Sequence, residues 1–326
     1  MRLALLPPIA FCLIALPALA DVERTLQDHI LPGHEALARA TDDLASEAAT
    51  DCAPEAVRPA FHAAYDAWIA IGHIQFGPIE DQALTLAMSF WPDPKDSTGK
   101  ALARLTATQD PIADSPSAWS EVSAAAQGFT ALERLLYEAQ PDAGYACRLT
   151  QAVSTGLADK SASILRDWPA FASKMTTAGA EGNTRFQSPV EAQRAAYTAL
   201  STGLEFLHDQ RLGRPLGTFD RPRPRRAEAR RSERSLRHIQ LSLAALEALA
   251  LSMSDADLTG TRAAFAAARA RADDLDDPTL ASVADPGGRF RLELVQQAVR
   301  AVQIAVIDEI GKPLGITAGF NALDGD

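Results

Sequence analysis

The 326-residue sequence has few aromatic side chains, few cysteines and almost no strand pattern. Aromatic residues make up 6% of the chain and there are three cysteines. Short runs in which apolar and polar residues alternate are nearly absent, whereas alanine and leucine dominate and apolar residues recur at helical spacing. The sequence therefore predicts an all-α protein, and its length provides enough apolar material for one large core or two smaller ones.

Long hydrophobic runs are also missing, except at the start of the chain. Residues 1–20 contain Arg2, an apolar run from Leu3 to Leu16, and the segment Ala18-Leu19-Ala20, which together are typical of a signal peptide. The run is too short, and too interrupted by proline, to make a good membrane span. We therefore predict cleavage after Ala20 and a mature protein that is located in the periplasm and has no transmembrane segment.

Positive charge is the scarcer sign. Without Arg2 the chain has 30 basic and 42 acidic residues, a net charge of −12. This balance disfavours nucleic acid or anionic lipid as the main partner. A local exception is the segment 221–237, which contains eight arginines. It is interpreted either as a solvated linker or as a clamp in which planar guanidinium groups hold an anion or a carboxylate.

Two cysteines remain after the signal peptide, Cys52 and Cys147. In an oxidising compartment an isolated pair is most simply one disulfide. Such a bond would close a loop of 95 residues and would contribute at most about 4–5 kcal/mol through the entropy of the unfolded chain. Two free buried thiols are the alternative.

A short helix-ending motif occurs twice. The segment Gly213-Arg214-Pro215-Leu216-Gly217 returns as Gly311-Lys312-Pro313-Leu314-Gly315, and upstream of each lies an Ala-Leu-Glu-x-Leu helix that contains Glu133 or Glu247. We interpret this pattern as an internal duplication that produces two antiparallel helical bundles. Residues 21–217 are predicted to form the first bundle, and residues 218–326 the second bundle with an ordered C-terminal tail.

The segment 128–136 is the most informative for chemistry. On a helix its phenylalanine and leucines form one apolar stripe, and Thr130 and Glu133 lie side by side one turn apart. Gly128 leaves space above that pair for a ligand or a neighbouring backbone. A histidine at position 130 would complete Gly-x-His-x-x-Glu, a pattern that suits a metal ion or proton transfer, but this chain has threonine there.

The histidines do not form a recognisable metal motif elsewhere in the sequence. No His-x-x-Glu or His-Glu-x-x-His is present. We expect His34 to be a solvated surface residue, and His62 to be an ordinary polar helix residue. His73 would lie about 16 Å from His62 along a helix, so one ion could not use both. The single Glu-x-x-His, at Glu205 and His208, is half of what a ferritin-like di-iron site requires.

Five motifs in chain order resemble the imelysin family of exported bacterial helical proteins, and the resemblance covers nearly the whole mature chain. These motifs are Trp68 with Phe76-Gly77-Pro78, Trp91-Pro92-Asp93, Gly128-Phe129-x-Ala131-Leu132-Glu133, Glu228-x-x-Arg231-Ser232-x-x-Ser235, and Leu314-Gly315 followed by Gly319-Phe320-Asn321 and Asp324-Gly325-Asp326.

The resemblance implies a pair of helical bundles in the periplasm or at the outer membrane. It also implies an origin among iron-acquisition genes and a historical description as a metallopeptidase. The family's Gly-x-His-x-x-Glu site falls on Gly128, Thr130 and Glu133, so threonine replaces the histidine. A threonine hydroxyl is a poor ligand for a divalent metal and no general base near neutral pH.

We therefore predict a non-catalytic binding or accessory component of iron acquisition. Its partners would be iron-uptake proteins of the periplasm or outer membrane, and its candidate cofactor an iron or other divalent metal ion. One alternative is an active metallopeptidase whose missing ligand comes from His62, His73 or His208. The other is a structural module that binds a partner protein at the outer membrane.

The predicted binding groove lies where the motifs would converge. Glu133 would accept hydrogen bonds or contact a metal ion. Arg231 would hold a carboxylate or orient Glu133, and Ser232 would cap its helix. The predicted groove residues are Gly128, Thr130, Glu133, Trp91, Asp93, Arg231, Ser232, Asn321 and Asp324.

Overall fold

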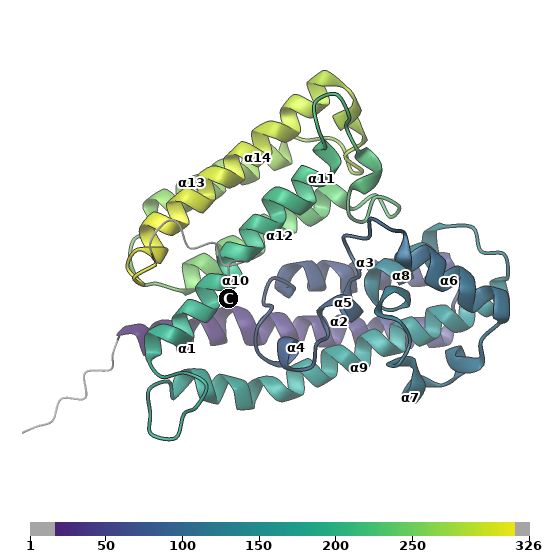
Figure 1. Cartoon of the computed structure of the whole chain (residues 1–326), viewed down its shortest axis with the longest axis horizontal. Coiled ribbons are helices and arrows are strands. Elements are labelled where there is room, and N and C mark those ends of the chain that lie inside the picture. The colour runs from purple at the N-terminus through teal and green to yellow at the C-terminus, as the bar shows by residue number, and fades with distance from the viewer. Residues whose placement is uncertain (1–16, 317–326) are drawn as a thin grey trace, which may run out of the picture.

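The computed structural model describes residues 17–316, and all named elements in that range are helical (Figure 1). The all-α prediction is therefore confirmed. The longer helices are α1 (Pro17–Thr25), α2 (Leu31–Thr50), α3 (Pro54–Ile71), α6 (Ser97–Thr108), α8 (Gly128–Tyr137), α9 (Ala143–Thr176), α10 (Pro189–Glu205), α12 (Ser235–Ser252), α13 (Thr259–Asp273) and α14 (Pro286–Val306). Four-residue helices are α4 (Pro78–Asp81), α5 (Thr85–Met88), α7 (Pro116–Trp119) and α11 (Gly213–Leu216), and 3₁₀ turns lie at Pro111–Asp114, Ala124–Ala126, Pro224–Arg226 and Ala281–Ala284.

The first part of the chain forms a bundle around α2. Helix α2 packs against α3 and α9, and α8 packs against the same two helices. Aromatic contacts fix α8 to α3, because the Phe129 and Tyr65 rings stack with centroids 4.7 Å apart. The helix that carries Thr130 and Glu133 is thus held in the core of this bundle.

Helices α12, α13 and α14 form a second group, with α13 and α14 along the upper edge of Figure 1 and α12 further inside. Helix α12 also packs against α3, so the apolar cores of the two groups are continuous. Helix α10 lies before the predicted division at residue 217 but packs against α1, α12 and α14. The division at that residue stays a prediction.

Polar side chains define where two of the long helices begin. The Asp142 carboxylate accepts a hydrogen bond from the Tyr145 N–H at 2.9 Å, which starts α9. At α10, Ser188 accepts from the N–H of Glu191, while the Glu191 carboxylate accepts from the Gln187 N–H at 2.6 Å. This reciprocal arrangement resembles a capping box and satisfies N–H groups that the helix itself cannot.

Within residues 17–316, three helices contain a wide π turn that ends two or three residues before a proline. A proline inside a helix has no N–H to donate and its ring collides with an earlier carbonyl, so a local change of hydrogen-bond register lets the chain continue. The first helix accordingly runs past Pro32 without breaking. The three turns are Leu26–Ile30 before Pro32, Phe206–Leu212 before Pro215, and Ile307–Gly311 before Pro313. Both copies of the helix-ending motif thus follow a π turn, which is compatible with the duplication, although the duplication itself stays a prediction.

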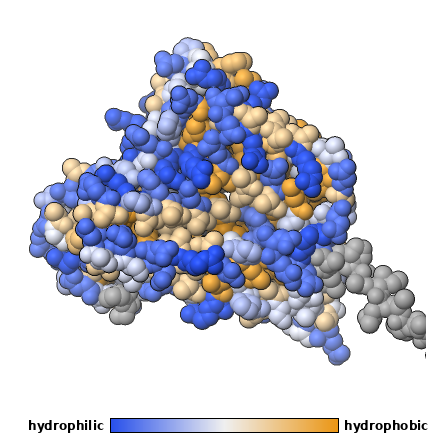
Figure 2. Space-filling model, turned by 180° about the vertical axis from the view of Figure 1, so that it is seen from behind, coloured by the Kyte–Doolittle hydropathy of each residue, from blue (hydrophilic) through white to orange (hydrophobic). Residues whose placement is uncertain are grey.

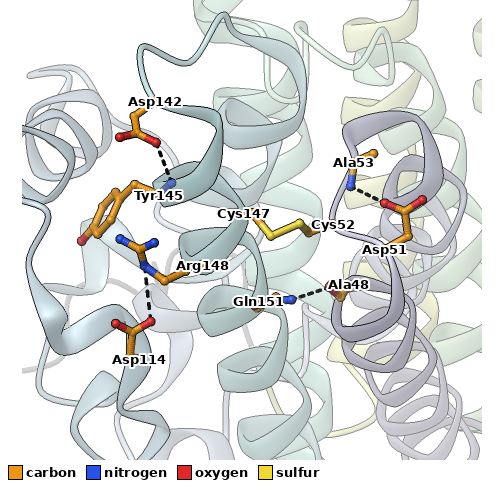
Figure 3. The surroundings of a disulfide bond; sticks show 10 residues. All are labelled: Ala48, Asp51, Cys52, Ala53, Asp114, Asp142, Tyr145, Cys147, Arg148 and Gln151. Carbon is orange, nitrogen blue, oxygen red and sulfur yellow. Dashed lines mark hydrogen bonds and ion pairs between the residues drawn. A yellow bond between two sulfur atoms is a disulfide. The ribbon is translucent and has the colours of Figure 1, made fainter.

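The predicted disulfide between Cys52 and Cys147 is confirmed (Figure 3). Cys52 lies in the turn between α2 and α3, Cys147 lies on α9, and their Cα atoms are 5.3 Å apart. Next to the bond, the Gln151 amide donates to the Ala48 carbonyl at 3.1 Å. The bond therefore fixes the α2–α3 turn to the long helix that crosses the first bundle.

On the face in Figure 2, polar residues surround apolar residues that gather towards the middle. Among the described residues the exposed large apolar side chains are Leu86, Phe219, Phe290 and Ile304. None of the helices within residues 17–316 combines the length and the apolar composition that a bilayer crossing requires.

Candidate functional site

Glu133 is a buried carboxylate whose partner comes from the other half of the chain. Only 3% of the residue is exposed. Its Oε1 atom accepts hydrogen bonds from the Ser232 N–H at 2.9 Å and from the Ser232 hydroxyl at 2.8 Å. Charge-assisted bonds of this kind are about twice as strong as neutral ones. Ser232 therefore fixes Glu133 and does not cap a helix as we predicted, because α12 begins three residues later.

Gly128 and Thr130 pack against the end of α5. Gly128 has φ = +75°, and a Cβ atom there would lie 2.3 Å from the Met88 carbonyl oxygen. The space above Gly128 is thus filled by a neighbouring backbone, which was one of the two predicted possibilities. The Thr130 hydroxyl lies 3.3 Å from the Ser89 hydroxyl and is buried.

A cavity of about 230 Å³ opens above Glu133, and it is called the basic cavity here. The structure places five of the predicted groove residues in its wall, namely Trp91, Asp93, Thr130, Glu133 and Arg231. Gly128 and Ser232 are not in its wall, although Ser232 bonds to Glu133, which is. Asn321 and Asp324 fall outside the described residues. The sequence motifs are thus brought together, while their function stays a prediction.

Six arginines line this cavity, and they come from three regions of the chain. Arg134 is on α8 and Arg214 is on α11, in the first helix-ending motif. The remaining four lie in the segment between α11 and α12. The six are Arg134, Arg214, Arg225, Arg226, Arg230 and Arg231. The arginine-rich segment that we interpreted as a linker or an anion clamp therefore forms one wall of the cavity.

The three carboxylates in the cavity wall are already occupied. Asp93 accepts the N–H groups of Ser97 and Thr98, both at 2.8 Å, at the start of α6. Burial alone would raise the pKa of Asp93, but these hydrogen bonds outweigh it and lower that pKa. Asp96 pairs with Arg134, and Glu133 is held by Ser232. Each of the three therefore has a partner within the protein, and Asp96 is the one whose partner is a cation.

Arg231 does not orient Glu133. It pairs with Glu138, which lies on the turn after α8. This contact agrees with the first of the two roles that we expected, the holding of a carboxylate, but the carboxylate belongs to the protein itself.

A second cavity, of about 240 Å³, lies on the other side of Trp91. Its wall includes Arg211 and Glu228, which are joined by an ion pair of 2.7 Å, and His238 Nδ1 lies 3.1 Å from the same Glu228 oxygen. Burial would raise the pKa of Glu228, but Arg211 and His238 outweigh it and hold this pKa at about 2. The three side chains form a buried network around Glu228, in which His238 Nε2 has no hydrogen-bond partner within the described residues.

Each of the histidines proposed as a missing metal ligand has a hydrogen-bond partner other than Glu133. His62 is hydrogen-bonded to the Tyr137 hydroxyl at 2.6 Å, and His208 pairs with Asp209. His73 Nε2 lies 2.9 Å from His29 Nε2, at the wall of the second cavity. Among residues 17–316 no three histidine, cysteine or acidic side chains are placed to hold a metal ion together.

His34 was wrongly predicted to be solvated. It is 1% exposed, its ring lies 5.2 Å from that of Trp168, and neither ring nitrogen has a hydrogen-bond partner within the described part of the chain. Burial lowers its pKa to about 3 and that of His29 to about 4. The sequence could have predicted the burial of His34, because this residue lies at helical spacing from the apolar Leu37 and Leu44, which are also buried.

Sequence reasoning also missed the position of Arg214 and the partner of Glu228. Nothing near Arg214 in the sequence indicated that the helix-ending motif would place a guanidinium in the wall of the basic cavity. Glu228 belonged to a quoted motif, but its pairing with Arg211 joins the end of one helix to the segment before another. Pairs of this kind depend on tertiary packing that one sequence does not reveal.

Comparison with known proteins agrees with the fold and with the family resemblance. The imelysin family profile matches residues 30–306. An imelysin-like protein from Psychrobacter arcticum 273-4 has a similar structure, with a TM-score of 0.77, 19% identity, and coverage of 93% of this chain and 97% of that one. A protein from Parabacteroides distasonis ATCC 8503 described as an iron-regulated protein A precursor has a TM-score of 0.72 and 12% identity, with coverage of 89% and 93%. No curated protein matches the chain. Because the family profile spans most of the sequence, the chain belongs to the imelysin family.

Proposed function

We propose that this protein is an exported, non-catalytic binding component of bacterial iron acquisition, and that the basic cavity is its binding site. The proposal rests on the hydrogen bonds that hold Glu133 and on the residue beside it. Its carboxylate is fixed from below by the Ser232 N–H and hydroxyl, and its neighbour one turn away is the hydroxyl of Thr130. Such groups position a ligand, but they do not activate water for hydrolysis.

The residues around Glu133 do not fit a catalytic divalent metal. A hydrolytic zinc site uses three protein ligands, most often with imidazole nitrogen among them. Here the helix offers one carboxylate and one hydroxyl, and six guanidinium groups line the same cavity. Their positive charge opposes a bare cation. We therefore derive no metal-dependent step for this chain.

Three observations support the link to iron and the export to the periplasm. The structurally similar Parabacteroides protein is described as iron-regulated and as a precursor. Residues 1–20 have the composition of a signal peptide. A disulfide between Cys52 and Cys147 also suits an oxidising compartment.

Iron uptake in a deletion strain tests this function. Wild-type protein and Glu247→Gln are expected to restore uptake of radioactive iron under iron limitation, whereas Glu133→Gln is expected to reduce it about tenfold. Glu247 is the matched control because it occupies the equivalent position in the second Ala-Leu-Glu-x-Leu helix and pairs with Arg269 outside the cavity. Immunoblotting would show that the three proteins reach equal levels.

Two results would contradict the proposal. One is an uptake result: either deleting the gene leaves iron uptake unchanged, or Glu133→Gln restores uptake to the wild-type level. The other is cleavage of an unfolded protein by the purified wild type, provided that a chelator abolishes this cleavage. That second result would favour the metallopeptidase alternative.

A further inference from the structure

Four of the six arginines in the basic cavity have no carboxylate partner within the described chain. Arg134 and Arg231 are paired with Asp96 and Glu138. The other four, Arg214, Arg225, Arg226 and Arg230, make no ion pair among residues 17–316. Their recorded hydrogen bonds are with neutral groups: Arg214 donates to the Gln210 side chain, and Arg230 to the Arg225 carbonyl.

This concentration of charge is unfavourable in the free protein. Burial and then the neighbouring Arg226 lower the pKa of Arg214. Burial, followed by Arg231, lowers that of Arg230. Like charges close together repel each other, and partial burial weakens the screening by water. The chain as a whole has a net charge of −11, so the cavity is a local reversal of the overall sign.

The cavity has the size and lining of a site for a small organic anion. Its volume of about 230 Å³ lies below the range of roughly 300–1,000 Å³ that is typical for drug-sized ligands. Guanidinium groups form paired hydrogen bonds to planar oxyanions. The guanidinium groups in this cavity come from separate segments of the chain, so together they can contact several anionic groups on one molecule. Tyr65 and Trp91 add flat apolar surface for a carbon skeleton.

We infer that the basic cavity binds a small polycarboxylate, held by Arg214, Arg225, Arg226 and Arg230 above the fixed Glu133. This deepens the proposed function, since it names the ligand class of the same cavity. An anionic ligand would also allow iron to enter as a negatively charged chelate, which the guanidinium groups attract although they repel the bare ion.

Calorimetry on the full mature protein, in buffer of low ionic strength, tests the inference. Citrate is expected to bind with a dissociation constant in the micromolar range, and acetate, which has a single carboxylate, at least about 100-fold more weakly. Raising the salt concentration should weaken citrate binding, because the contacts are partly exposed ion pairs. Trp91 lies in the cavity wall, so its fluorescence should change with the same titration midpoint.

A matched pair of double variants identifies the site. Arg225→Gln/Arg226→Gln removes two guanidiniums from the cavity. Arg271→Gln/Arg291→Gln removes two exposed arginines on α13 and α14 and changes the net charge by the same amount. The cavity variant is expected to bind citrate at least about tenfold more weakly than wild type, since hydrogen bonds to charged groups dominate such sites. The control should bind as wild type does.

Three outcomes would overturn the inference. Citrate could bind more weakly than about millimolar at low salt, or the cavity variant could bind no more weakly than the control. Pyrophosphate could instead bind at least tenfold more tightly than citrate, which would assign the cavity to phosphates. Circular dichroism would show whether both variants keep the wild-type helical content. If citrate binds as expected but deletion of the gene does not change iron uptake, the proposed function is wrong and this inference still holds.

Discussion

The two helix-ending motifs both adjoin a π turn and both end on a glycine with positive φ, but they place opposite charges beside these features. Counted back from the glycine that opens each motif, Arg211 in the first copy corresponds to Glu309 in the second. Arg211 forms a buried ion pair with Glu228. Glu309 instead accepts the N–H groups of Gly260 and Thr261, both at 2.8 Å, at the start of α13.

The basic residue inside each motif differs in the same way. Lys312 pairs at 2.6 Å with Asp308, four residues before it, so its charge is neutralised on its own helix. Arg214 has the amide of Gln210 at that position and keeps its charge for the basic cavity. The shared pattern thus determines how the helix ends, while the residues around it determine whether a binding site can form there.

The largest difference between the two copies should appear when their equivalent charged residues are removed. Arg211→Met leaves the Glu228 carboxylate buried beside His238 without its guanidinium partner. Breaking a buried pair on one side costs about 3–5 kcal/mol. We expect urea unfolding to show a loss of that size.

The double variant Arg211→Met/Glu228→Gln is the control for this prediction. It removes both charges, so it should recover more than half of the loss. A single-variant loss below about 1 kcal/mol would show that the pair is not buried as described.

Acid titration should reveal the same ion pair in the unmodified protein. The pKa of Glu228 is held at about 2, below its ordinary value of 4.5. A depressed carboxyl pKa stabilises the fold above the unfolded-state value, and this contribution is lost as the pH falls from about 4.5 towards 2. The full contribution is on the order of 3 kcal/mol.

The measurement is the free energy of unfolding of wild type minus that of Glu228→Gln at each pH. The difference should be constant between pH 5 and 7 and should shrink steadily below pH 4.5. A difference that stays constant down to pH 3 would contradict the assigned pKa.

The sequence was sufficient to predict the fold class and the disulfide because both depend on local or compositional signals. Helical periodicity repeats in every long segment, and the two cysteines that follow the predicted signal peptide leave one pairing. The wide turn before Pro32 was only partly predictable. Proline indicates an interruption, but whether the helix breaks or changes register depends on what packs around it.

The candidate site was predicted less completely. Motifs placed Trp91, Asp93 and Glu133 in one groove, and the structure brings them to one cavity. The partner of Glu133 was named, but its role was wrong, since Ser232 holds the carboxylate and caps no helix. Which arginines are paired depends on residues such as Glu138 that approach only in the folded protein.

The smallest predicted effect concerns the second copy. Leu258, at the N-terminal cap position of α13, has no side chain that can accept a hydrogen bond, and Glu309 serves this purpose from another element. Losing an N-terminal cap costs about 1 kcal/mol, so Glu309→Ala should destabilise the protein by about that amount in urea unfolding. Asp308→Ala removes only the exposed pair with Lys312 and should change stability by less than about 0.5 kcal/mol. Equal losses of stability for the two substitutions would show that Glu309, like Asp308, acts only as a surface charge and caps no helix. The charged residues of the second copy would then contribute almost nothing to stability, and the difference from Arg211 in the first copy would be larger still.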